Sequence, residues 1–234
     1  MKINITESYE QSCTIVAGRI INLVREKPNA LLGLATGSTP IPVYQRLVAA
    51  YKAGLSFARV RTVNLDEYAN LKDASQSYRA FMEEHLFNHI NINLENITIA
   101  DYRGDPDAEA KRLRDFLAAN TVDFQILGVG HNGHIGFNEP DVALYAASYV
   151  TSLAPRTVEA NARFFGSAAD VPRRAVTMGM AEIMAAKEIA LIATGAEKAP
   201  AVRSLRDGFV TPQWPCTFLK LCPHANVYVD ETAL

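Results

Sequence analysis

The sequence predicts a single α/β domain over residues 1–234, with one doubly wound, mostly parallel sheet and helices on both faces. Three observations support this Rossmann-like class. Short apolar runs of strand length alternate with stretches of helical spacing along the chain. The links between them are short, and there is neither an internal repeat nor a low-complexity segment. At 234 residues, the chain is also long enough to bury a sizeable core.

The expected elements follow the hydrophobic pattern in chain order. Residues 142–173 have weak periodicity and allow two interpretations, a cover over the site (a lid near 151–176) or a poorly patterned helix. The other segments show clearer patterns, with glycine, proline or asparagine at many of their ends. They are helix 7–25, strand 30–35, helix 41–53, strand 60–65, helix 77–89, strand 97–100, helix 105–120, strand 122–129 and strands 175–178, 189–193 and 227–229.

Composition and charge exclude several classes of protein. A net charge of −2 without a basic cluster argues against a nucleic-acid or anionic-membrane surface as the main partner. Cys13, Cys216 and Cys222 are odd in number and lack CxxC spacing, which favours reduced thiols. Neither a signal peptide nor an apolar run of about 18 residues is evident. We therefore expect a soluble, cytoplasmic protein that acts on a small molecule.

The chemistry is expected at residues 125–140, QILGVGHNGHIGFNEP. A buried strand ends there in a turn with four glycines, which let the backbone approach a ligand closely. His131, Asn132, His134 and Glu139 supply polar side chains between and after these glycines. Open α/β sheets bind their ligands at the carboxyl ends of strands, where these residues would lie.

Two further strand-to-helix turns suit a phosphate group. Thr36, Gly37, Ser38 and Thr39 precede a helix that Pro40 can begin, so hydroxyls and free N–H groups meet the positive end of a helix dipole. The same residues also suit a simple capped helix start, and no Walker lysine follows. Lys198 lies early in another helix, where it is either a phosphate ligand or a surface lysine.

Asp66 and Glu67 follow the strand at 60–65. Neighbouring residues on an extended chain face opposite sides, so only one of the two carboxylates is expected to enter a given pocket. Such a carboxylate is a candidate general base, although in isolation a solvated acidic turn explains it better. His85 and His89 lie four residues apart on one helix face but lack an evident third metal ligand.

In combination, these motifs resemble the glucosamine-6-phosphate deaminase (glucosamine-6-phosphate isomerase) family, to which 6-phosphogluconolactonases are related. The resemblance rests on LGLATGSTP (32–40), NLDEY (64–68), GVGHNGHIGFNEP (128–140), NARFF (161–165) and GAEK (195–198), which occur in the family's order. The lactonases typically have Asp-Glu-Arg where this chain has Asp66-Glu67-Tyr68. They also lack the Phe-Asn-Glu-Pro that follows His134 here.

The resemblance implies conversion of glucosamine 6-phosphate and water to fructose 6-phosphate and ammonia, without a cofactor or a metal. His134 would open the sugar ring, and Glu139 and Asn132 would orient its imidazole. Asp66 would move a proton from C2 to C1. The residues that would hold the phosphate are Thr36, Gly37, Ser38, Thr39, Arg163 and Lys198.

The chain departs from well-known members at three places. Asn132 stands where some relatives have aspartate. Tyr149 and Thr151 match the basic allosteric-site residues of hexameric members and cannot pair with a phosphate as cations do. The sequence also ends at Leu234, short of the carboxyl-terminal extension of those hexamers. We therefore expect a monomer without allosteric activation.

Four alternatives remain open at the level of sequence. His131, His134 and Glu139 form a permissible zinc ligand set, although the resemblance does not require a histidine at 131. A non-enzymatic sugar-phosphate sensor needs the phosphate loop but not Asp66, His134 and Glu139. A lactonase-like hydrolase or a galactosamine-6-phosphate deaminase would use the same fold, and the contact that reads the C4 hydroxyl is not identifiable.

Overall fold

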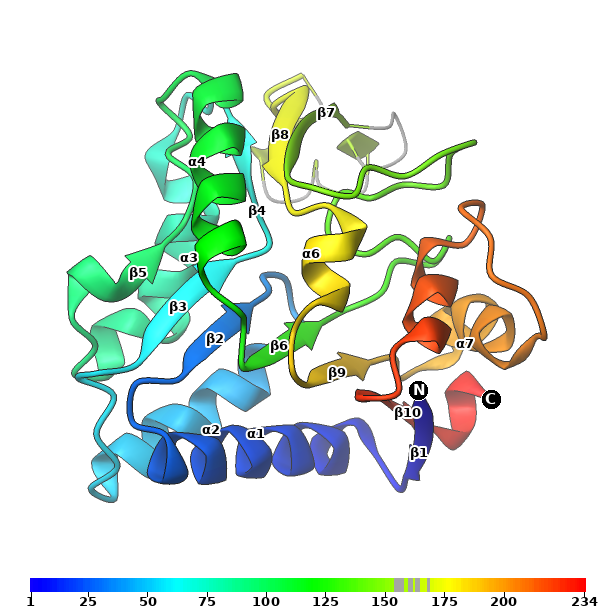
Figure 1. Ribbon diagram of the computed structural model, residues 1–234, viewed down its shortest axis with the longest axis horizontal. Coiled ribbons are helices and arrows are strands. Elements are labelled where there is room, and N and C mark those ends of the chain that lie inside the picture. Colours follow the sequence, from blue (N-terminus) through cyan, green and yellow to red (C-terminus); the bar gives the residue numbers. More distant parts are fainter. Residues whose placement is uncertain (154–157, 160–161, 163–164, 168) are drawn as a thin grey trace.

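The computed structural model describes the chain except for residues 154–157, 160–161, 163–164 and 168. Within the described residues, strands and helices largely alternate, as the hydrophobic pattern predicts, except that β4 follows β3 and β7 follows β6 without a helix between them (Figure 1). No helix in this part of the chain combines the length and apolar character needed to span a membrane.

The main sheet has seven strands in the order β1-β10-β9-β6-β2-β3-β5. Every neighbouring pair in it is parallel, which confirms the predicted doubly wound class. The central strands β2, β6 and β9 are buried at every residue, as expected of a sheet covered on both faces. The strands are β1 (Lys2–Thr6), β2 (Leu31–Leu34), β3 (Arg61–Asn64), β5 (Ile97–Thr98), β6 (Phe124–Leu127), β9 (Ile189–Ile192) and β10 (Ala225–Asp230).

Helices cover both faces of this sheet. On one face, α1 (Tyr9–Glu26), α2 (Ile41–Lys52) and α3 (Tyr78–His85) share a core with the even-numbered residues of β2 and β6. On the other face lie α4 (Pro106–Ala119), α6 (Met180–Met184) and α7 (Ala199–Arg206). Figure 1 shows α1 and α2 below the sheet and α4 and α6 above it. Short 3₁₀ segments occur at Ala74–Gln76, Phe87–His89, Leu94–Asn96, Ala196–Lys198, Pro215–Leu221 and Glu231–Ala233.

Local sequence explains where the helices begin. The side chains of Ser8, Ser77 and Asp105 accept hydrogen bonds from the backbone N–H three residues on, at the starts of α1, α3 and α4. These caps satisfy donors that a helix leaves without a partner. Along α1, buried residues recur three or four positions apart and form one face against the sheet. His85 and His89 have local roles, against the ring of Phe81 and near Glu84 O respectively.

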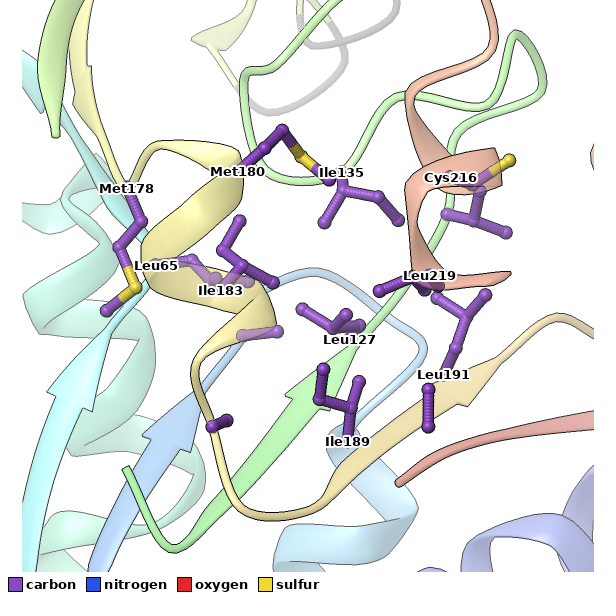
Figure 2. Close-up of a cluster of buried hydrophobic side chains, with 14 of the residues drawn as sticks. Leu65, Leu127, Ile135, Met178, Met180, Ile183, Ile189, Leu191, Cys216 and Leu219 are labelled. Carbon is purple, nitrogen blue, oxygen red and sulfur yellow. The ribbon is translucent and has the colours of Figure 1, made fainter. Parts of the chain in front are cut away.

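A second, smaller sheet stands beside the first. It consists of β4 (Asp66–Ala69), β8 (Arg174–Thr177) and β7 (Tyr149–Ser152), paired antiparallel in the order β4-β8-β7. The predicted strand at 175–178 therefore exists but belongs to this sheet. Its residues Val176 and Met178 join the core of the main sheet, so the hydrophobic interior continues between the two sheets (Figure 2). The lid near 151–176 stays a prediction, since it includes residues outside the described part of the chain.

Candidate active site

The site lies where the winding of the main sheet reverses. From β2 the chain adds β3 and then β5 on one side, and it starts again with β6 on the other side of β2. Ligands of open α/β sheets bind at such a switch point. The loop 36–40 leaves the end of β2, and the loop 128–140 follows β6. These loops meet, because a Cβ added at Gly128 would lie 3.9 Å from Thr39 Cβ.

Three of the six predicted phosphate residues line a cavity beside this switch point. Ser38 and Thr39 line it together with Thr194, Gly195 and Lys198, and its volume is about 330 Å³. The α2 helix begins at Ile41, after Pro40, which provides no side-chain cap. Pro40 and Pro42 have no N–H, and the Ile41 N–H donates to Ser38 O at 3.3 Å, so this helix start offers an anion few free backbone donors. The Lys198 Nζ lies 3.2 Å from Oε1 of the exposed Glu197.

Other predicted phosphate residues are placed less directly. Thr36 and Gly37 lie on the same loop, and Gly37 has a φ of 91°, a conformation that favours glycine. Neither residue lines the cavity of Ser38 and Lys198. Arg163 lies outside the described residues, so its predicted contact with the phosphate stays a prediction.

Two residues that sequence reasoning missed fix the backbone of this cavity. The Tyr9 hydroxyl donates toward Ser38 O and Thr39 O at 3.1 and 2.9 Å. Burial raises the pKa of Tyr9, so the phenol stays a donor. The Asp230 carboxylate accepts the Gly195 N–H at 3.0 Å. Both residues are far from the glycine motifs in sequence, and no local pattern marks them.

His134, Glu139 and Asn132 come together within the loop 128–140. Asn132 Nδ2 donates to Glu139 Oε2 at 2.7 Å, and the other oxygen of that carboxylate, Oε1, lies 3.3 Å from His134 Nδ1. The second separation is that of an ion pair rather than an aligned hydrogen bond. The ring of His134 lies where a Cβ at Gly130 would be, within 2.2 Å of it, so only glycine fits at 130. One carboxylate thus bridges the imidazole and the amide.

The two neighbouring acids point to different places. Glu67 is fully buried, and its carboxylate accepts three backbone N–H bonds, from Tyr68, Tyr78 and Arg79, at 2.9 to 3.0 Å. Two of these donors begin α3, so Glu67 stabilises a helix N-terminus. Asp66 Oδ2 instead lies 3.3 Å from the Cβ position of Gly136, next to the loop that carries His134. The geometry separates a structural acid from one that faces the candidate site.

Both acids have raised pKa values. Burial, followed by the charge of Glu67, raises the pKa of Asp66 to about 8. Burial also raises the pKa of Glu67 to about 7, although its backbone hydrogen bonds to Tyr78, Arg79 and Tyr68 oppose the shift. An acid whose pKa lies near neutrality exchanges protons readily at physiological pH, which is the property required of a general base.

The zinc site considered from the sequence does not form among the described residues. They contain no group of three or more His, Cys, Asp and Glu side chains that could hold a metal ion. His131, His134 and Glu139 are thus not arranged as a ligand set in this part of the chain.

Comparison with known proteins places this site in a family. The model of the family described as glucosamine-6-phosphate isomerases/6-phosphogluconolactonase matches residues 5–228. The chain belongs to this family. A glucosamine-6-phosphate deaminase from Thermoanaerobacter pseudethanolicus is 44% identical over 100% of this chain and 94% of its own length. One from Clostridium perfringens is 42% identical over 100% of this chain and 98% of its own.

Solved structures of the family have the same fold. One reported as a monomeric glucosamine-6-phosphate deaminase superposes with a TM-score of 0.94 at 39% identity, covering 100% of this chain and 98% of its own. The 6-phosphogluconolactonase from Trypanosoma cruzi reaches a TM-score of 0.79 at 18% identity, covering 99% of this chain and 95% of its own. At that identity the lactonase shows the common fold alone.

Proposed function

We propose that this protein converts glucosamine 6-phosphate and water to fructose 6-phosphate and ammonia. The observation that carries the proposal is the bridge from Asn132 through Glu139 to His134, with Asp66 beside the same loop. Full-length relatives at 42–44% identity are glucosamine-6-phosphate deaminases, which supports this substrate over a lactone. The site's own residues supply the acid–base chemistry, and no cofactor is required.

His134 opens the pyranose ring in this proposal. Its imidazole takes the proton of the anomeric hydroxyl and delivers one to the ring oxygen. The second ring nitrogen faces the Glu139 carboxylate, which selects the tautomer and stabilises the imidazolium. Asn132 holds the other carboxylate oxygen, so Glu139 keeps its orientation toward the imidazole during the transfer.

Asp66 then carries out the isomerisation. As a carboxylate it removes the proton from C2 of the open aldehyde, which leaves an enol-type intermediate, and it returns a proton at C1. The resulting C2 imine takes up water and loses ammonia, giving the ketose. Ser38, Thr39 and Lys198, which line the cavity, hold the 6-phosphate at the far end, so remote binding energy positions the reacting carbons.

The raised pKa of Asp66 predicts a pH dependence. Only the ionised carboxylate removes the C2 proton, so kcat/KM of the free enzyme is expected to rise with pH and level off above about 8. Glu67→Gln removes a neighbouring negative charge that favours the protonated acid. It should therefore shift the rise of kcat/KM to lower pH. The measurement is kcat/KM from initial rates between about pH 5.5 and 9.5 in buffers of constant ionic strength. If kcat/KM of Glu67→Gln rose over the same pH range as in the wild type, the effect of the Glu67 charge on the pKa of Asp66 would be contradicted.

The substrate assignment is tested with purified protein treated with a chelator. Mixed with glucosamine 6-phosphate, it should release fructose 6-phosphate and ammonia in equal amounts, each followed by a separate coupled assay. Loss of activity on chelation would support the metal alternative. Turnover of galactosamine 6-phosphate alone, or of 6-phosphogluconolactone alone, would assign that compound as the substrate instead. Binding without any turnover would indicate a sensor.

We also propose a monomer without allosteric activation. The solved relative at 39% identity is described as a monomeric deaminase, which supports this assembly state. In this chain, the Tyr149 hydroxyl lies 3.3 Å from Asn138 Oδ1, so the Tyr149 side chain contacts the loop 128–140. Sedimentation velocity should give a species of one chain, and rate curves should be hyperbolic with or without N-acetylglucosamine 6-phosphate. Sigmoidal curves that this compound makes hyperbolic would contradict the proposal.

A further inference from the structure

A segment near the carboxyl end of the chain, residues 211–217, holds the loop 130–141 at two points. Cys216 donates its backbone N–H to Gly133 O at 2.8 Å. Gln213 Nε2 donates to Asp141 O at 2.6 Å, and Asp141 N–H donates to Pro212 O at 3.3 Å. The first contact precedes His134 by one residue, and the second follows Glu139 by two.

At the first point an indole covers the loop. Gly133 is buried and has a φ of 81°. A Cβ there would lie 2.7 Å from Trp214 Cε3 and 3.1 Å from Cys216 Sγ, so only a hydrogen fits between the loop and the indole. The loop cannot move toward residues 211–217 at this position. The backbone N–H of His134, the next residue, donates to Asn132 Oδ1 at 3.3 Å. Asn132 in turn binds Glu139, so the contact at Gly133 is connected to the Glu139 carboxylate.

The segment 211–217 is itself held firmly. The buried Thr217 hydroxyl accepts the Thr211 N–H at 2.9 Å and lies 2.7 Å from Trp214 O, which closes residues 211–217 into a compact turn. Figure 2 shows Cys216 and Leu219 in the same hydrophobic cluster as Ile135 of the loop. The two segments therefore share one part of the core, and the partly buried indole of Trp214 packs against it.

We propose that Trp214 is a positioning residue that fixes the backbone at Gly133 and thereby sets the separation between the His134 imidazole and the Glu139 carboxylate. That separation is 3.3 Å without an aligned hydrogen bond, so a small shift of the loop changes it. Trp214 acts through Gly133. The inference rests on the proposed function only for its kinetic readout.

The kinetic test compares Trp214→Ala and Trp214→Phe with Phe116→Ala. Phe116 of α4 packs partly buried against the same core cluster, so its truncation is a matched loss of aromatic packing outside residues 211–217. Trp214→Ala should lower kcat about a hundredfold, because displacements near 1 Å at reacting groups have such effects. KM should change by less than about threefold, since the phosphate cavity is separate. Trp214→Phe should recover part of kcat, and Phe116→Ala should keep it.

A second readout does not depend on activity. The ring nitrogens of His134, assigned with His134→Gln, are followed by ¹⁵N NMR in each variant. Their shifts should change in Trp214→Ala and stay the same in Phe116→Ala. The chain contains one tryptophan, so wild-type emission reports the surroundings of Trp214 and serves as a check that the indole is packed in the folded protein. Should Trp214→Ala fail to fold, Trp214→Phe supplies the same comparison.

The outcomes separate this inference from the proposed function. A wild-type protein inactive on glucosamine 6-phosphate would reject the function, while the His134 shifts would still test the contact. A folded Trp214→Ala with kcat within about twofold of wild type and unchanged His134 shifts would overturn the positioning role. Equal kinetic losses in Phe116→Ala would also overturn it, since they would indicate general destabilisation.

Discussion

Replacement of Asp66 by asparagine is expected to abolish exchange of the substrate C2 hydrogen with solvent and to lower kcat at least about a thousandfold. The change keeps the shape of the side chain but removes the group that accepts the proton. Asp66 is the acid that lies beside Gly136, and burial gives its carboxyl a pKa of about 8. The measurement is ¹H NMR of glucosamine 6-phosphate in deuterium oxide, with the C2 signal followed over time.

Glu67→Gln is the matched control for this variant. The Glu67 Oε1 accepts the N–H groups of Tyr68 and Tyr78, and a glutamine oxygen can retain both bonds. Only the bond from the Arg79 N–H to Oε2 is lost. We therefore expect a moderately destabilised protein that still exchanges the C2 hydrogen, within about tenfold of the wild-type rate at the optimum pH of each. The reverse ranking of the two variants would overturn the assignment of the base.

Glu139→Gln is expected to lower kcat at least about a hundredfold. Glutamine keeps a partner for Asn132 but removes the negative charge opposite His134 Nδ1, so the imidazolium formed during ring opening loses its stabilisation. An amide NH₂ in that place also favours the wrong tautomer of the ring. A hundredfold loss corresponds to about 2.7 kcal/mol of transition-state stabilisation.

Steady-state rates and the ¹⁵N shifts of His134 check this prediction in the same sample. Glu83→Gln is the control, because Glu83 forms a surface ion pair with Arg79 on α3. Loss of a surface pair should leave kcat within about twofold. A Glu139→Gln enzyme with wild-type kcat and an unchanged tautomer would remove Glu139 from the mechanism.

The sequence was most informative where local chemistry decides structure. The glycine turns after β2 and β6 were recognisable because they interrupt buried strands with polar residues, and parallel strands bring their carboxyl ends to one edge. Alternation along an extended chain also predicted that only one of Asp66 and Glu67 faces the site. Which of them faces the site depends on α3, whose first N–H groups bind Glu67, and this contact joins residues eleven and twelve positions apart.

Contacts between segments far apart in the chain could not be predicted from the sequence. The edge strand β1 pairs with β10 at the other end of the chain, and its short pattern did not distinguish it from a polar terminus. Strand β8 has the composition of a buried parallel strand but pairs antiparallel with β4. Tyr9, Asp230 and Trp214 reach the site from elements whose own sequences carry no functional motif. Their roles depend on tertiary packing alone.

The central claim is that this protein is a deaminase that moves a proton between C2 and C1. The most direct measurement runs the wild-type reaction on glucosamine 6-phosphate in deuterium oxide and analyses the product by NMR while ammonia is quantified. The account predicts fructose 6-phosphate with deuterium at C1, formed in the same amount as ammonia. Fructose 6-phosphate without ammonia, or ammonia without the ketose, would contradict it.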